Sequence, residues 1–218
     1  MAALHGNTPD CPAISPFMPK VHPLKSGLIK KDESGKILDA RSSVTLIVSG
    51  TRKIVVDTGL KGEELQILKA LAGLGFRPEE IDTIVNTHSH ADHCGNNHLF
   101  SQAKILEPRD GETIAPGVWT METSGHSLDS ISVFVEGFGI VVMAGDALPT
   151  LGNFQKNVPP VLHVDRVRAL ASMAKIVSLA DVVVPGHDLP FSIRSRAYIQ
   201  LTPTTDLCNQ SAAHRLTK

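Results

Sequence analysis

The stretch THSHADH holds the densest group of potential metal ligands in the chain: His88, His90, Asp92 and His93 lie within a few positions of one another, directly after an apolar run. Imidazole and carboxylate groups are the side chains that hold divalent metal ions. The spacing of His88 and His90 lets two imidazoles on one loop face one ion, whereas Asp92 and His93 can face a second. This stretch therefore predicts a metal site at the end of a strand.

Four further runs rich in β-branched residues end in a histidine or an aspartate within a turn of Gly, Thr or Ser. These runs are VVDTG, TSGH, VVMAGDA and VVVPGHD, which carry Asp57, His126, Asp146 and His187. Strand ends are the rigid platform on which active-site loops are built. A lone histidine at a strand end is usually an ordinary polar side chain, so the prediction depends on all the segments together. We expect His126, Asp146 and His187 to complete two metal sites, with one carboxylate shared between the ions.

Short β-branched segments separated by turn residues predict the sheets that position these groups. Strands are expected over 26–30, 42–50, 51–59, 81–87, 103–107, 117–124, 131–137, 139–147 and 181–188. The turn signal KDESGK separates the first two of these segments. The pattern predicts a strand meander followed, in the second half of the chain, by further sheet.

Two segments have the apolar period of an amphipathic helix. The expected apolar stripe is Leu65, Leu68, Leu71 and Ala72 in residues 61–75, and Val167, Leu170, Ala174 and Val177 in residues 165–180. We expect these stripes to pack on the sheets.

The length of 218 residues, with 42% hydrophobic residues, suits one domain with a substantial core. Five prolines near the start remove the amide donors that helices and central strands need. We therefore expect a Pro-rich N-terminal arm over 1–20, a globular domain over 21–200 and a C-terminal tail over 201–218.

The composition also limits the classes of partner. A net charge of −1 gives no general electrostatic basis for binding nucleic acid, and no apolar run is long enough to span a membrane. Cys11, Cys94 and Cys208 lie far apart in the sequence, which argues against a disulfide framework. The start lacks a charged segment followed by an apolar core, so we expect a cytoplasmic protein without a membrane partner.

THSHADH, His126, Asp146 and His187, with Asp57 upstream, together resemble the five ordered motifs of the metallo-β-lactamase superfamily. This resemblance implies an α+β fold, a four-layer αββα sandwich with the metal site at the edge of the sheets. It also implies a set of metal ligands. His88, His90 and His126 would hold the first ion, Asp92, His93 and His187 the second, and Asp146 would bridge them.

Two neighbouring divalent ions, which we expect to be Zn²⁺ with Fe or Mn as alternatives, define the expected chemistry. They lower the pKa of a bridging water towards neutrality, so that a hydroxide nucleophile exists at pH 7, and they polarise the attacked group. The predicted catalytic residues are Asp146 and Asp92 beside the ions, and Asp57 as the acceptor that orients a ligand imidazole.

Other polar residues near the motifs are expected to have structural roles. Asp129 in GHSLDS is expected to be a turn residue that bonds its own backbone. His98 has no ligand-like neighbours, and replacing it is expected to be nearly silent.

The substrate stays open between three hypotheses. Within the superfamily, GHSLDSISV and ADVVVPGHDLPF resemble a subfamily that suggests a phosphodiester substrate and ribonuclease-like activity. This first hypothesis predicts basic residues around the pocket, namely Arg166, Arg168, Arg194 or Lys156. The second is an acyl hydrolase acting on a lactone, ester, thioester or β-lactam. It predicts an apolar pocket lined by Leu148, Leu151 and Phe154.

The third hypothesis is a non-hydrolytic metal-binding protein or an iron-dependent sulfur dioxygenase. A complete set of seven ligands argues against it, because a mononuclear site would not need Asp92 and His187. The expected partner is thus a small-molecule or RNA substrate, and a homodimer stays open.

Overall fold

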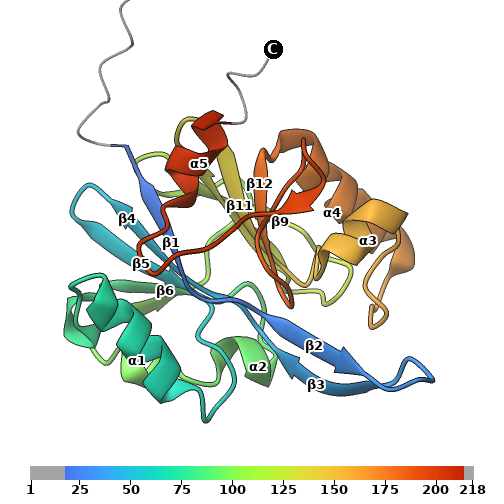
Figure 1. The fold of residues 1–218 in the computed structure, drawn as a ribbon, viewed down its shortest axis with the longest axis horizontal. Helices are drawn as coiled ribbons and strands as arrows, with labels where there is room; N and C mark the ends of the chain where they lie inside the picture. Colours follow the sequence, from blue (N-terminus) through green and yellow to red (C-terminus); the bar gives the residue numbers. More distant parts are fainter. Residues whose placement is uncertain (1–17, 214–218) are drawn as a thin grey trace, which may run out of the picture.

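The computed structural model describes residues 18–213, which form two β-sheets packed face to face with helices on their outer sides (Figure 1). The predicted Pro-rich arm falls almost wholly outside these residues. No helix in the described range is both long enough and apolar enough to span a membrane.

The first sheet has the strand order β1-β4-β5-β6-β7. Its strands are β1 (Lys20–Lys25), β4 (Val44–Ser49), β5 (Arg52–Val56), β6 (Thr83–Val85) and β7 (Lys104–Leu106). β1, β4 and β5 pair antiparallel, whereas β5, β6 and β7 are parallel neighbours. The carboxyl ends of β5 and β6 therefore meet at one edge of this sheet.

The second sheet has the strand order β14-β13-β12-β11-β10-β9-β8. Its strands are β8 (Thr113–Ala115), β9 (Val118–Glu122), β10 (Ile131–Glu136), β11 (Ile140–Gly145), β12 (Val182–Pro185), β13 (Phe191–Ser192) and β14 (Ala197–Tyr198). β11 and β12 are parallel, and β9 runs in the same direction because β10 is antiparallel to both β9 and β11. The carboxyl ends of β9, β11 and β12 thus share an edge.

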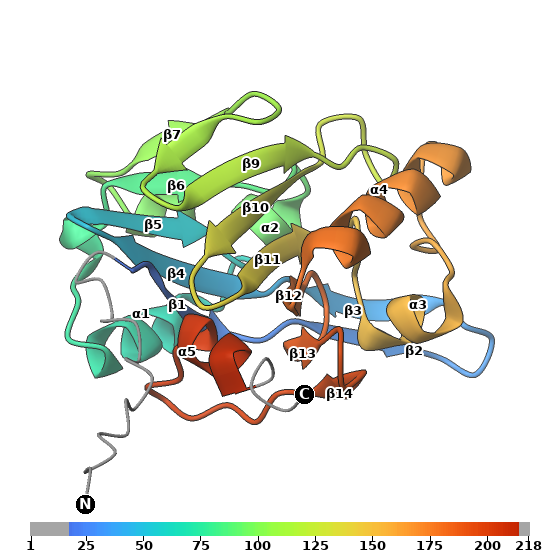
Figure 2. The same cartoon turned by 90° about the horizontal axis from the view of Figure 1, so that it is seen from above.

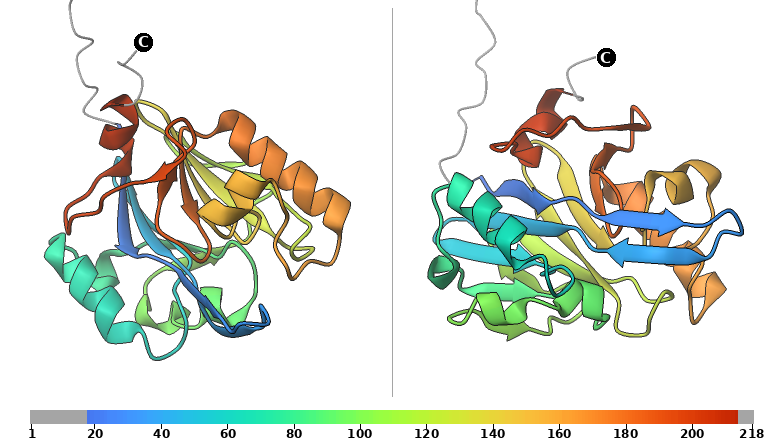
Figure 3. Two further views of the ribbon diagram at one scale, coloured as in Figure 1. Left: turned by 45° about the vertical axis from the view of Figure 1, so that its right-hand side comes forward. Right: turned by 60° about the horizontal axis from the view of Figure 1, so that its bottom comes forward.

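The α-helices are α1 (Glu64–Gly73), α2 (Ala91–Cys94), α3 (Leu151–Lys156), α4 (Arg166–Leu179) and α5 (Leu207–Ala213), with short 3₁₀ turns η1 (Pro78–Glu80) and η2 (Asn97–Leu99). Helices α1 and α4 form the outer layers, as Figures 2 and 3 show from several sides, whereas α5 lies against both sheets. α1 covers the first sheet and α4 covers the second.

The side-chain alternation of the strands accounts for the layers. In β10, Val133 and Val135 lie in the core between the two sheets, whereas Phe134 points to the other face and packs below α4. In β4, Ile47 faces the second sheet and Leu46 faces α1. In a strand that is buried on both faces, successive side chains enter two different cores, because they point to opposite sides of the sheet. The αββα sandwich expected from the sequence is confirmed.

The α1 helix buries a different stripe from the one expected. Ile67 and Leu71 are fully buried, whereas Leu65 is 80% exposed. The buried carboxylate of Glu63, one turn before Ile67, pairs with the buried ammonium of Lys25 on β1 at 3.1 Å. Leu71 belongs to the expected stripe whereas Ile67 does not, so the buried face of the helix is rotated from the one that apolar periodicity predicted.

The α4 helix likewise buries Ala169, Met173 and Ile176, while Val167 is 77% exposed. Its start packs against the loop before β10. A Cβ atom at Gly125 would lie 2.2 Å from the backbone nitrogen of Ala169. Ala169 therefore lies on the buried face of α4. The contact with Gly125 is distant in the sequence, so the local residue pattern does not predict it.

The residues expected to form a C-terminal tail contribute to the domain instead. Leu207 and Cys208 of α5 are buried, and α5 contacts β1 and β11. The carboxylate of Asp206 accepts a hydrogen bond from the backbone nitrogen of Val21 at 3.0 Å. The described domain therefore extends to the end of α5.

A hairpin of β2 (Leu28–Lys31) and β3 (Ile37–Arg41) projects from the sandwich as an extension of β1 and β4 (Figure 1). The segment KDESGK forms its turn, where the carboxylate of Asp32 accepts hydrogen bonds from the backbone nitrogens of Ser34 and Lys36. The expected meander is therefore broken, because β2 pairs with β3 and not with the sheet.

Candidate metal centre

The predicted site residues all lie at the edge where the parallel strands of both sheets end. Asp57 follows β5 and the histidine cluster follows β6, while Asp146 and His187 follow β11 and β12. His126 lies in the loop after β9. The parallel pairing of these strands brings together residues that are up to 130 positions apart in the sequence.

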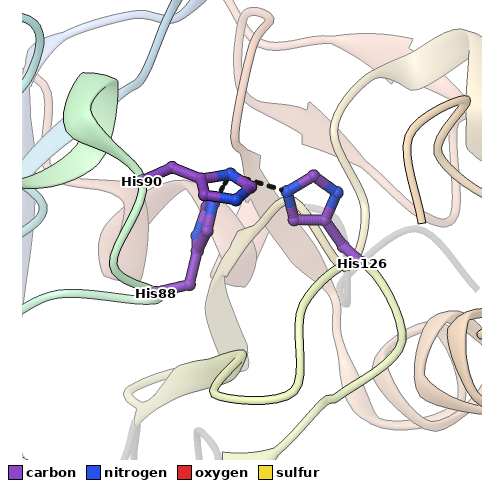
Figure 4. Close-up of side chains that lie close together, drawn as sticks. All are labelled: His88, His90 and His126. Carbon is purple, nitrogen blue, oxygen red and sulfur yellow. Dashed lines mark hydrogen bonds between the residues drawn. The ribbon is translucent and has the colours of Figure 1, made fainter. Parts of the chain in front are cut away.

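Three imidazoles form the first group of potential ligands, and Figure 4 shows them converging. Nδ1 of His90 lies 2.9 Å from Nε2 of His88 and 3.0 Å from Nε2 of His126. Burial, together with the neighbouring His93, lowers the pKa of His88 to about 2. His88 is therefore a neutral imidazole, the form that binds metal ions.

Asp92, His93 and His187 form a second group of potential ligands. The carboxylate of Asp92 lies 3.5 Å from Nε2 of His187 and 3.8 Å from Nε2 of His93. These side chains reach the same point from the loop after β6 and from the end of β12.

Asp146 lies between the two groups. Its Oδ1 is 3.4 Å from Nε2 of His93 and 3.1 Å from Nε2 of His187, and its Oδ2 is 3.4 Å from Nε2 of His126. Burial disfavours the carboxylate, but the neighbouring imidazoles of His187 and His93 keep the pKa of Asp146 well below its ordinary value. The shared, ionised carboxylate is thus in the position expected of a bridging ligand.

The outward nitrogen of each of three imidazoles meets an oxygen acceptor. Nδ1 of His126 lies 2.7 Å from the carbonyl oxygen of Leu162, and Nδ1 of His187 lies 3.0 Å from that of Arg41. Nδ1 of His93 lies 2.8 Å from the carboxylate of Asp57. A proton held on Nδ1 leaves the lone pair of Nε2 pointing inward, which is the tautomer that ligates a metal.

Two buried atoms inside the cluster lack a hydrogen-bond partner among the described residues. They are Nε2 of His93 and Oδ1 of Asp146, which face each other across 3.4 Å. Unpaired buried polar atoms are costly unless something else satisfies them. Imidazole lone pairs and carboxylates that converge in this way fit divalent metal ions.

Asp57 lies directly behind this cluster, as expected from the sequence. It has a positive φ of 55°, and its carboxylate accepts hydrogen bonds from the backbone nitrogen of Thr87 at 2.7 Å and from the Thr87 hydroxyl at 2.9 Å. The same carboxylate bonds His93. Burial and this contact have opposite effects on His93, and the net result raises its pKa well above the ordinary value.

Several residues that orient the site were missed in the sequence. Thr87 bonds Asp57, and the backbone carbonyls of Arg41 and Leu162 orient two ligands. Thr87 could have been identified from its position as the first residue of THSHADH. The two backbone carbonyls could not, because any residue type supplies one.

Asp129 lies in a turn and bonds its own backbone, as expected, and it has a further role. Its carboxylate accepts a hydrogen bond from the backbone nitrogen of Ser89 at 3.0 Å, and so joins the loop of His126 to the loop of His88 and His90. Although partial burial opposes ionisation, hydrogen bonds from Ser127 and Ser89 lower the pKa of Asp129 to about 2. The carboxylate stays charged at any physiological pH.

A cavity of about 170 Å³ lies over the ligand cluster. Its wall is largely apolar, with Ile29, Ile37 and Ala40 from the hairpin and Pro149, Pro160, Val161 and Leu162 from the segments around α3. The apolar wall agrees with the acyl-hydrolase hypothesis, and Pro149, Thr150 and Asn153 from the expected segment 148–154 line the cavity. Leu148, Leu151 and Phe154 are core residues, and none of Lys156, Arg166, Arg168 and Arg194 lines the cavity.

The fold and the cluster together define a metallohydrolase of the αββα sandwich class, and comparison with known proteins agrees. The model of the metallo-beta-lactamase superfamily matches residues 39–109. Metallo-beta-lactamase domain-containing protein 1 of Xenopus laevis is 35% identical over 193 residues, covering 79% of this chain and 81% of the relative. The chain belongs to the metallo-β-lactamase superfamily, and it is a hydrolase of that fold.

Two further relatives have names that state an activity. An N-acyl homoserine lactonase of Bacillus cereus is 28% identical over 160 residues, covering 58% of this chain and 64% of the relative. A solved structure of a quorum-quenching N-acyl homoserine lactone hydrolase has a TM-score of 0.65 at 22% identity, covering 86% of this chain and 97% of that one. The second likeness concerns the fold.

Proposed function

We propose that the protein is a dinuclear metal-dependent hydrolase of a carboxylic acid derivative, such as an ester, a lactone or a thioester, with an apolar acyl group. The observation that carries the proposal is the apolar wall of the cavity over the metal ligands. Small-molecule sites are mostly apolar, with a few polar groups that fix the orientation. The lactonase relative of Bacillus cereus supports the same class of substrate.

The residues that would hold the ions are the two groups described above, with Asp146 between them. His88, His90 and His126 would bind one ion, Asp92, His93 and His187 the other. When bound, two divalent ions supply positive charge that activates water for attack and polarises the scissile group. We expect zinc, because three imidazoles and a carboxylate suit it.

The protein's own groups orient the reaction. In hydrolysis, the oxygen of water bonds to the carbonyl carbon, the bond to the leaving oxygen or sulfur breaks, and that atom receives a proton. The Asp92 carboxylate, whose side chain is 20% exposed, faces the cavity and can hold a proton for this leaving atom. Asp57 keeps Nδ1 of His93 protonated, and the apolar wall excludes water from the acyl group.

The phosphodiester hypothesis has less support. It requires cations to bind the phosphate, yet the arginines that it predicts are absent from the cavity wall, and the net charge is −1. The test therefore includes a phosphodiester and an RNA as alternative substrates.

The test measures hydrolysis by zinc-loaded protein of para-nitrophenyl hexanoate, bis(para-nitrophenyl) phosphate and an end-labelled single-stranded RNA. Asp146→Ala, purified identically, measures contaminating activity, and His98→Ala is the matched control, since His98 is exposed and outside the cluster. We expect ester cleavage by the unmodified protein and by His98→Ala, with loss in folded Asp146→Ala. Cleavage of the phosphodiester or RNA alone would replace the proposal with a nuclease.

A further inference from the structure

The β2–β3 hairpin has two chemically different faces. Ile29 pairs with Ala40 and Lys31 pairs with Ile37, and these four residues line the cavity. The opposite face carries Leu28 and Lys30 in a separate surface hollow. Lys30 and Lys31 are adjacent in sequence but face different spaces, because side chains alternate along a strand.

The side chain of Lys31 is exposed and lacks a hydrogen-bond or ion-pair partner in the described part of the chain, although carboxylates are near in the sequence. Asp32 is occupied by its own turn, where it accepts from Ser34 and Lys36. Asp39 is occupied by Arg41 at 3.1 Å. The hairpin therefore leaves the charge of Lys31 available to a ligand.

The other polar groups of the cavity wall are already satisfied. The hydroxyl of Thr150 donates to the side chain of Asn153 at 2.6 Å and accepts from its backbone nitrogen. The side-chain amide of Asn153 donates to the carbonyls of Val158 and Pro159 at 3.1 and 3.0 Å. Apart from the metal ligands, Lys31 is thus the one charged side chain in this wall.

The position of Lys31 relative to the metal ligands follows from the register. The carbonyl of Arg41 bonds His187, so this end of β3 lies at the metal centre. Leu28 pairs with Arg41, and Lys31 lies three residues after Leu28 in β2, beyond a bulge in the register, which places it roughly 10 Å from this end at about 3.3 Å per residue. The apolar pair Ile29 and Ala40 lies between.

We propose that Lys31 recognises a negatively charged group at the far end of the acyl chain, so that the substrate class is an acyl compound with an apolar spacer between its scissile carbonyl and an anion. This inference rests on the proposed acyl hydrolysis and names its substrate more closely. The scissile carbonyl would lie beside the metal ligands, and the apolar spacer would contact Ile29 and Ala40. The anion would form an ion pair with the ammonium group of Lys31.

The experiment compares two substrates of similar size: para-nitrophenyl hexanoate, which is neutral, and the mono-para-nitrophenyl ester of adipic acid, which ends in a carboxylate. With zinc-loaded protein, Lys31→Gln should raise KM for the anionic ester by about three- to five-fold, the range of an accessible ion pair, and change KM for the neutral ester little. kcat should change little for both. The preference should weaken at high salt.

Lys30→Gln is the matched control, because it removes the same charge from the opposite face of the same hairpin, and it should leave both KM values unchanged. An ester ending in a phosphonate distinguishes the source of the anion: stronger dependence on Lys31 indicates a phosphate group, and weaker dependence a carboxylate. Equal effects of Lys30→Gln and Lys31→Gln, or none, would overturn the inference.

The two proposals fail in different ways. If neither ester is hydrolysed above the Asp146→Ala background, the proposed function is wrong. If the neutral ester is hydrolysed but Lys31→Gln does not alter selectivity, only the role of Lys31 is wrong. Competitive inhibition by adipate against hexanoate gives a second readout, since adipate should bind more tightly to the unmodified protein but not to Lys31→Gln.

Discussion

At the scale of single residues, the ligand tautomers are set by acceptors on the outer side of the cluster. Asp57 and the carbonyls of Arg41 and Leu162 each accept a hydrogen bond from Nδ1 of one imidazole. Such outer partners decide which nitrogen of a histidine is free to bind metal. Asp57 is the one side chain among these three acceptors, so it is the one that mutation can alter directly.

Asp57→Asn should weaken zinc binding by about 10- to 100-fold. The asparagine oxygen can still accept from the backbone nitrogen of Thr87, but its amide then faces His93 as a donor. This arrangement moves the imidazole proton to Nε2 and blocks the ligating lone pair. Competition with a chromophoric chelator measures the affinity, with His98→Ala as control. An unchanged affinity would show that Asp57 does not set this tautomer.

At the scale of elements, the residues directly after β12 pack against the base of the β2–β3 hairpin, where the hairpin joins the first sheet. The backbone nitrogen of Ser43 donates to the carbonyl of Gly186 at 2.8 Å. A Cβ atom at Gly27 would lie 2.3 Å from that same carbonyl oxygen and 2.5 Å from Cα of His187. Only glycine allows this approach, which holds the hairpin over the metal ligands.

Gly27→Ala should therefore destabilise the fold by about 1–3 kcal/mol, the usual cost of overpacking against a rigid neighbour. Gly73→Ala is the control, because Gly73 lies in α1 with open space around its Cα, and alanine favours a helix by up to about 1 kcal/mol. Urea unfolding monitored by circular dichroism should separate the two variants in opposite directions. Equal stabilities would contradict the close contact.

At the scale of the whole molecule, the metal centre joins the two sheets. His88, His90, Asp92 and His93 come from the loop after the first sheet's β6, whereas His126, Asp146 and His187 follow strands of the second sheet. Each proposed ion would have ligands from both sheets. Binding therefore opposes separation of the sheets, since the unfolded chain does not hold these ligands together.

Removing metal should consequently lower the thermal stability of the protein. At free zinc about 100-fold above Kd, binding adds about 2.7 kcal/mol, which corresponds to roughly 5–10 °C in Tm for a chain of this size. Calorimetry of chelator-treated protein, before and after adding zinc, measures the difference. Asp146→Ala should show a smaller shift, and an identical Tm with and without zinc would contradict a site that bridges the sheets.

The sequence by itself determined the strands that carry the site and the residue types at their ends, but it did not predict β1, β3, β8, β13 and β14. Strand alternation and turn residues are local properties, so β5, β6, β11 and β12 were predictable, together with their terminal histidines and aspartates. The order of these motifs pointed to the superfamily, and the family comparison confirms it.

The tertiary structure alone decided which helix faces are buried, which distant residue Asp129 bonds and which residues form the cavity wall. Each depends on a partner far away in the chain: Glu63 pairs with Lys25, and Asp129 accepts a hydrogen bond from Ser89. The β2–β3 hairpin lines the cavity together with segments from the second half. The apolar periodicity of a helix indicates that one face is apolar, but it does not identify the residues against which that face packs. The position of Lys31 over the metal ligands exists only once the chain is folded.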